Sequence, residues 1–211
     1  TVTGEVAAAT LDISGAIDVA GTTNLDVVDI DGAVDMASTL LVAGVLTANA
    51  GAVFNEGSAD VDFRVESNGN ANMVFVDGGN DKVAIGTATA TAMLTVAGSL
   101  KPITYQETYV ASSAASTVTL DLATGTSFSL TMDQATTFAF SNPPGSGTAF
   151  SFTLFLTQHS TAVAITWPNT VDWAGGSAPD AAAADALQAY AFFTRDGGTT
   201  YYGFLGGTAI A

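Results

Sequence analysis

The sequence predicts an all-β protein in which a repetitive shaft of short strands precedes an antiparallel, jelly-roll-like β-sandwich. Three observations predict this. Glycine occurs 22 times in 211 residues while charged residues make up only 11%, which suits many tight turns. Apolar and polar residues alternate with a period of two in both halves. Of the 19 aromatic residues, three lie in residues 1–100 and sixteen in residues 101–211, which indicates two domains of different core.

Composition excludes several classes of protein. Twenty acidic and four basic residues give a net charge of −16, so no basic track exists for binding nucleic acid. The chain has no cysteine, which excludes disulfides and thiolate metal sites. Polar residues interrupt the most apolar segment, residues 149–167, so no membrane insertion is expected. Residue 1 is Thr, and we expect the chain to be processed or part of a longer one.

Residues 1–62 are predicted to form the shaft. A short apolar segment closed by glycine recurs at intervals that leave room for strands of only three to five residues. It occurs at residues 12–15, 18–21, 29–32 and 41–44, and again at 95–98. A single repeat of this kind cannot bury a core, and its apolar residues are small or β-branched. This pattern favours a thin axis shared by three intertwined chains, as in a trimeric β-helix or β-prism. A single-chain β-solenoid is the competing interpretation.

Residues 63–101 are predicted to form a neck, and residues 102–211 the sandwich head. The neck contains short strands and a G-x-G-T-like turn at Ala84-Ile85-Gly86-Thr87. Pro102 biases Lys101 towards extended backbone, as expected at a junction. Asn142-Pro143-Pro144-Gly145 and Asp196-Gly197-Gly198 are typical of turns between strands. The expected strands are 103–110, 117–122, 127–132, 136–140, 148–158, 163–167, 188–195 and 200–205, and 180–189 is expected as one helical turn or an irregular loop.

Several of these motifs resemble bacteriophage tail-fibre proteins. The segment Val74–Asp81, followed by Val83-Ala84-Ile85-Gly86-Thr87, is similar to the neck of such fibres, where a V-G-I-G-T turn precedes an L-x-V-x-G strand. Ala84 replaces the first glycine of that turn. Residues 11–36 resemble shafts of marine-phage fibres. The motifs at 165–168, 173–179 and 196–203 resemble distal domains of phage fibres.

The resemblance implies a homotrimeric virion fibre whose head presents a surface to the host. Its N-terminal side would join other tail or capsid proteins of the virion, and its head would contact a surface glycan or protein. Three alternatives stay open: a fibre or decoration protein on the capsid, a glycan depolymerase, and a bacterial surface adhesin.

No catalytic, cofactor or metal site is expected. Asp26, Asp29, Asp31 and Asp35 lack the glycine and glutamate spacing of an EF-hand loop, so they are expected on the solvated edge of a shaft. His159 is the single histidine, and no G-x-S-x-G elbow accompanies it. No pair of carboxylates is singled out for sugar hydrolysis. The chain is therefore predicted not to be an enzyme.

Four aromatic residues near turns are the candidate contacts with a host glycan or protein: Trp167, Trp173, Tyr201 and Tyr202. Aromatic faces stack on sugars and anchor protein contacts. Core packing competes with this role, most strongly for Trp167 and Tyr201. Because neighbours on a strand point to opposite faces, one tyrosine of the pair is expected inside.

Overall fold

The computed structural model describes residues 19–20, 23, 28, 30, 33–37, 39–55 and 57–210, and across them the chain is all-β with several sheets and no helix. The all-β prediction is therefore confirmed. It follows that this part of the chain has no helix long and apolar enough to cross a membrane. The chain divides into two compact units, residues 1–97 and residues 98–211.

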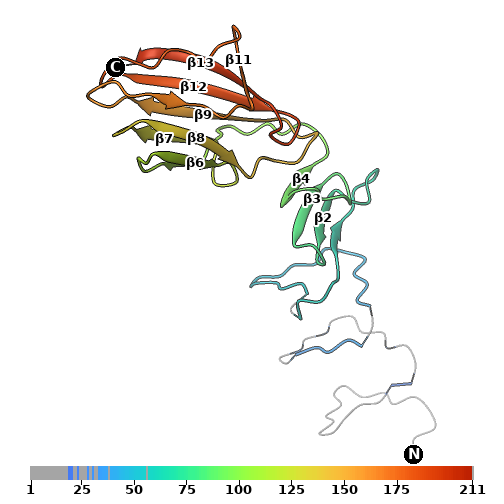
Figure 1. Ribbon diagram of the computed structural model, residues 1–211. Helices are drawn as coiled ribbons and strands as arrows, with labels where there is room; N and C mark the ends of the chain where they lie inside the picture. Colours follow the sequence, from blue (N-terminus) through green and yellow to red (C-terminus); the bar gives the residue numbers. More distant parts are fainter. Residues whose placement is uncertain are drawn as a thin grey trace, which may run out of the picture. The chain divides into compact units, whose positions relative to one another are not determined.

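The first unit contains one four-stranded sheet in the order β1-β2-β3-β4 (Figure 1). Its strands are β1 (Phe63–Val65), β2 (Val74–Asp77), β3 (Lys82–Ile85) and β4 (Leu94–Val96). The first three strands run antiparallel, and β4 is parallel to β3. In the turn between β2 and β3, Asp77 Oδ1 accepts hydrogen bonds from the backbone and side chain of Asn80. Asp81 takes a positive φ of 55°, which closes this turn.

No strand forms among the described residues before Phe63. The strand expected around residues 41–44 does not form in a single chain. A strand this short forms only where another strand satisfies its backbone groups, so the expected strand in a shaft shared by three chains stays a prediction. The repeats expected at 12–15, 18–21 and 29–32 lie wholly or partly outside the described residues. Every described residue from 19 to 69 is exposed to solvent.

The second unit contains two sheets. A three-stranded sheet has the order β10-β8-β6, and a six-stranded sheet has the order β11-β13-β12-β9-β7-β5. The strands are β5 (Tyr109–Ala111), β6 (Thr117–Asp121), β7 (Ser127–Thr131), β8 (Thr136–Ser141), β9 (Phe150–Thr157), β10 (Ile165–Thr166), β11 (Val171–Trp173), β12 (Leu187–Thr194) and β13 (Tyr201–Ile210). Strand β11 was not predicted, and residues 180–186 are irregular and not helical.

The strand pairing corrects the predicted antiparallel head. Five of the seven strand pairs in this unit are parallel, and only β9–β12 and β12–β13 are antiparallel. Strands β5 to β10 alternate between the two sheets, so each strand pairs with the strand two places along the chain. The connections cross between the sheets and return the chain in the same direction, whereas a hairpin would have reversed it.

Side chains from both sheets meet in one hydrophobic core. Phe138 and Leu120 come from the three-stranded sheet, and Phe128, Leu154 and Phe192 come from the six-stranded sheet. Rings dominate the centre: Phe152 stacks on Phe192 at 4.9 Å between centroids. The predicted alternation of buried and exposed residues is confirmed in β6, β7 and β9.

Candidate functional site

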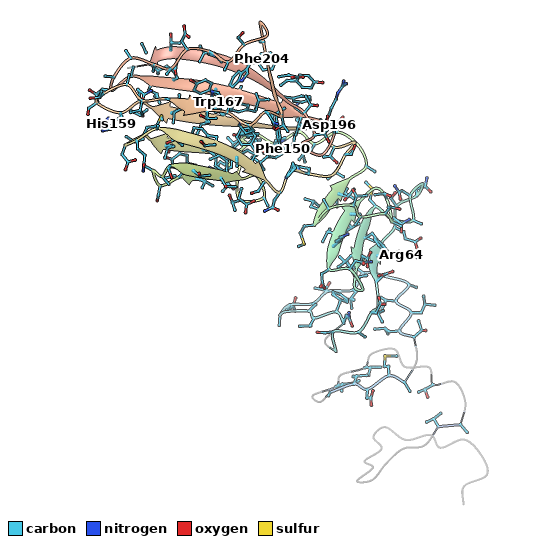
Figure 2. All side chains as sticks on the ribbon, viewed as in Figure 1. Arg64, Phe150, His159, Trp167, Asp196 and Phe204 are labelled. Carbon is cyan, nitrogen blue, oxygen red and sulfur yellow. The ribbon has the colours of Figure 1, made fainter. Side chains whose placement is uncertain are left out.

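The four predicted contact aromatics all lie in the second unit, but they do not form one exposed cluster. Trp167 and Trp173 contact each other edge to face, with centroids 5.2 Å apart. Trp167 also stacks on Phe138 at 5.0 Å. Both tryptophans pack against the core while keeping part of their surface in solvent. Figure 2 shows Trp167 among the strands of this unit.

Tyr201 is a core residue, with 3% of its surface exposed. Its ring contacts Phe140 at 5.0 Å and Phe152 at 6.2 Å. Burial, with a further contribution from the nearby Asp196 charge, raises the pKa of its hydroxyl. The expectation that one tyrosine of the pair lies inside is confirmed, and Tyr201 is not available to a partner.

Tyr202 is half-buried and lies on the outer face of the six-stranded sheet, because it follows the inward-pointing Tyr201. It sits directly across from Phe193 on β12 and from Asp172 on β11. Phe193 is 37% exposed, and Phe204, two residues along β13, is 49% exposed. Phe193 and Phe204 were not among the predicted contact residues. Their positions relative to Phe192 and Tyr201 place them on the opposite face of the sheet, and this alternation was the sequence signal for their exposure.

We name the side chains of Phe193, Tyr202 and Phe204 the outer aromatic patch. No charged residue occurs in the strands that surround it, β7, β9, β12 and β13, although Asp172 of β11 borders it. Next to it, β9 presents Ser151 opposite Phe193 and Thr153 opposite Ala191. Rings beside hydroxyls and one carboxylate are a surface that can stack on a sugar ring and hydrogen-bond its hydroxyls.

The turn from β12 to β13 holds the patch in place. Asp196 Oδ1 accepts hydrogen bonds from the Thr200 backbone N–H at 3.0 Å and from the Thr194 hydroxyl at 3.1 Å. The first of these bonds is the main cause that lowers the pKa of the Asp196 carboxyl. Gly197 and Gly198 both adopt positive φ, at 73° and 78°, which the turn requires. This carboxylate is therefore occupied in fixing the hairpin.

The same unit has a cavity of about 390 Å³ between residues 180–186 and the end of β13. Alanines form most of its wall. Its buried amide, Gln188, donates to the Asp180 carbonyl at 3.1 Å and accepts from the Tyr190 hydroxyl at 2.6 Å. These polar groups are satisfied within the protein, so they do not indicate a ligand.

The side chain of His159 has a local role. His159 Nδ1 lies 3.1 Å from the Thr161 backbone nitrogen within a turn. His159 and Asp196 are at opposite ends of the unit (Figure 2). Asp35 is exposed, while Asp26, Asp29 and Asp31 lie outside the described residues. Within the described part of the chain, no three His, Cys, Asp or Glu side chains gather closely enough to hold a metal ion.

Comparison of the chain with protein-family models, with curated proteins and with solved structures gave no match.

Proposed function

We propose that this chain is a structural protein of a bacteriophage virion, a homotrimeric tail fibre whose C-terminal head contributes to attachment to the host surface. The proposal treats residues 1–62 as a shaft shared by three chains, residues 63–101 as a neck and residues 102–211 as a sandwich head. It gives the chain no enzymatic activity.

One observation supports the proposal above the others: a single chain leaves many of the described apolar side chains of its first unit in water. Leu41 is 88% exposed, Val45 90% and Val53 73%. Burying one such side chain fully is worth about 1.5–3 kcal/mol. Monomeric soluble proteins rarely expose contiguous apolar surface on this scale, and larger patches mark contacts with other chains. Assembly with copies of the same chain supplies the missing core.

The head has features that suit attachment. Its outer aromatic patch contains no charged side chain, lies on a sheet with a well-packed core behind it, and is bordered by hydroxyl groups and by the Asp172 carboxylate. Interfaces favour rigid aromatic anchors of this kind. Together with the motifs that resemble phage distal domains, this favours a receptor-contacting head over a purely structural one. The partner would be a surface glycan or protein of the host.

The location is tested on intact virions. Gold-labelled antibodies raised against the full chain should mark the tail fibres, and the purified chain added to host cells should lower phage adsorption. Labelling of the capsid shell would transfer the chain to a capsid fibre. The release of reducing ends from host polysaccharide would instead reveal a depolymerase.

The attachment role is tested by substitution in the patch. Replacing Phe193 and Tyr202 by alanine should weaken binding of the chain to host cells at least about fivefold, the equivalent of about 1 kcal/mol. Thr119→Ala, at an exposed position of the three-stranded sheet, is the control and should bind as the wild type does. Equal binding by all three proteins would remove the patch from the attachment role.

A further inference from the structure

The sheet β1–β4 has one face made entirely of apolar side chains. The strand register aligns Phe63, Val76, Val83 and Leu94 in one row across the sheet. The next row on the same face is Val65, Val74, Ile85 and Val96. We name these eight residues the apolar face. They lie one residue out of step with Phe75 and Ala84, which point to the other side.

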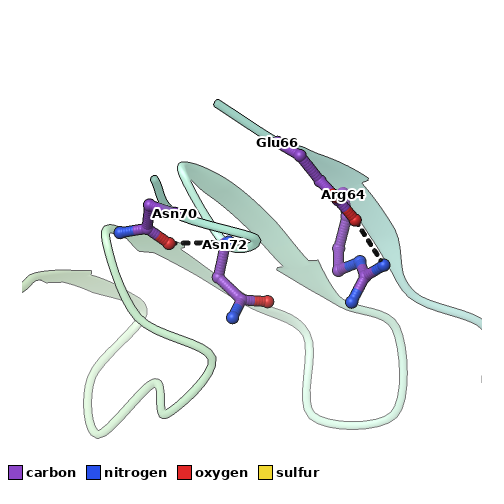
Figure 3. Close-up of polar contacts among 4 residues, drawn as sticks. All are labelled: Arg64, Glu66, Asn70 and Asn72. Atoms are coloured by element: carbon purple, nitrogen blue, oxygen red, sulfur yellow. Dashed lines mark hydrogen bonds and ion pairs between the residues drawn. The ribbon is translucent and has the colours of Figure 1, made fainter. Parts of the chain in front are cut away.

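The two faces of this sheet differ in charge. The strands contain three charged residues, Arg64, Asp77 and Lys82, and the register places all of them on the side opposite the apolar face. Arg64 Nη2 pairs there with Glu66 at 2.7 Å (Figure 3).

The two faces also differ in coverage. On the charged side, Ala84 is fully buried and Phe75 is 8% exposed. Asn70 fixes the segment before β2, because its side-chain amide donates a hydrogen bond to the Gly86 carbonyl at 3.1 Å. Its Oδ1 accepts a hydrogen bond from the Asn72 backbone N–H at 2.7 Å (Figure 3).

None of the eight side chains of the apolar face is buried. Phe63 is 37% exposed, Val65 43% and Leu94 56%. Phe54 contacts Phe63 with ring centroids 5.0 Å apart, at a cavity of about 270 Å³ that Val76 also lines. Phe63, Val65 and Leu94 are exposed, and the other five side chains are half-buried, so one chain covers this face only in part.

We infer that the apolar face packs against the same face of other copies of this chain, so that the four-stranded sheets enclose the axis of the assembly. The inference rests on the proposed homotrimer and identifies its contact surface. The charge distribution favours copies as the occupant. Each copy has a net charge of −16, so copies repel one another, and a face without charged side chains lets them meet with no cost of desolvating a charge.

The amount of apolar surface also agrees with self-association. Eighteen large hydrophobic side chains among the described residues of the first unit are exposed, from Val19 to Leu94. A stable protein interface uses about 20–30 residues on each side. The exposed side chains therefore supply most of an interface of that size, and three of them, Phe63, Val65 and Leu94, belong to the apolar face.

Cross-linking tests the packing directly, because the chain contains no cysteine and accepts a single thiol without background. Packed sheets lie about 10 Å apart, so a bis-maleimide of about that reach should join copies carrying Val76→Cys. Arg64→Cys, on the charged side of β1, is the control and should stay unlinked. Linkage at Arg64→Cys but not at Val76→Cys, in a chain that still assembles, would overturn the inference and leave the proposed fibre standing.

A charge placed on the face gives an independent readout. Val65 is at the sheet edge and partly exposed, so Val65→Lys leaves the sheet of one chain in place. It should weaken assembly at least about tenfold, because an unpaired ammonium would be buried between copies. Thr119→Lys adds the same charge on the second unit and should assemble normally. An undiminished Val65→Lys assembly would contradict the inference. A wild-type chain that is monomeric would contradict both this inference and the proposed fibre.

Discussion

The hydrogen bond between Tyr190 and Gln188 gives a prediction whose magnitude follows from the structure. Tyr190 on β12 is 0% exposed, and its hydroxyl donates to Gln188 Oε1 at 2.6 Å. Gln188 is 3% exposed. Tyr190→Phe keeps the ring, which lies 4.9 Å from the Trp167 ring, but leaves the Gln188 carbonyl without its donor. Such an orphaned buried acceptor costs about 1–3 kcal/mol, and we expect unfolding free energy to fall by that amount.

Tryptophan fluorescence in urea measures this loss. Both tryptophans, Trp167 and Trp173, lie in the second unit and contact Tyr190, so the signal reports on this unit. Wild type and variant are compared at equal protein concentration, because association shifts apparent stability. Tyr109→Phe is the matched control: its hydroxyl lies 2.6 Å from Ser129 Oγ, but at a side chain that is 61% exposed. Equal, negligible losses in both variants would refute the reasoning from burial.

The same tyrosine makes stability depend on alkaline pH. Burial raises the pKa of Tyr190 from 10.0 to about 12. Between pH 10 and pH 12 the unfolded chain loses this proton while the folded chain keeps it. The folded state therefore binds more protons, and the unfolding free energy falls with rising pH through that window. A difference of about two pKa units corresponds to about 2–3 kcal/mol, and Tyr190→Phe should show a correspondingly smaller fall than the wild type.

Three further predictions concern packing and assembly. Leu154→Ala removes a side chain that is 0% exposed in the middle of the core, and should lower unfolding free energy by about 2–5 kcal/mol in the same urea assay. Gly203→Ala would place a Cβ 2.7 Å from Trp173 Cε3 and 2.9 Å from Val171 Cγ1. It should cost about 1–3 kcal/mol and shift tryptophan emission, whereas Gly145→Ala, which has open space, should leave the emission unchanged. Added salt should strengthen assembly, measured by sedimentation, because it screens repulsion between chains that each have net charge −16, and an assembly that salt weakens would contradict an uncharged interface.

Sequence analysis predicted eight of the nine strands of the second unit and missed β11, and the strand expected at 103–110 is confined to β5, Tyr109–Ala111. In β7, Phe128 and Leu130 point inward and their serine neighbours point out, as the period of two requires. Alternation does not say whether the next strand turns back within its own sheet or crosses to the facing one. In both cases the buried residues Leu120 and Phe128 point into the same core, so the parallel pairing could not be read from the pattern.

The first unit shows that a local apolar pattern alone does not determine whether a segment forms a strand. Val83 and Ile85 in β3 form a strand because β2 and β4 lie on either side. Leu41 and Val42 have an equally apolar sequence but no strand beside them in the chain. In the proposed trimer, other chains would supply the hydrogen bonds of the predicted repeat, and a sequence does not state which chains do so.

The sequence predicted only part of the candidate site: it pointed to Tyr202 but not to Phe193 or Phe204. Trp167 and Trp173 lie near turns, which made them candidate contacts, while core packing competed most strongly for Trp167. In the structure both rings pack against Tyr190 and Phe192. Phe193 lies within an apolar stretch and was not predicted as a contact residue, although its position opposite Tyr202 makes it part of the outer aromatic patch. Cross-strand neighbours depend on the register, which the sequence does not state.

The mass of the full chain in solution tests the central proposal most directly. Sedimentation equilibrium and native mass spectrometry at micromolar concentration should give about 63 kDa, three times the 21.1 kDa of one chain. In the proposed trimer, other copies cover the exposed apolar side chains of the first unit, so the trimer should persist on dilution. A particle of 21.1 kDa, stable and monodisperse in dilute buffer, would contradict the account.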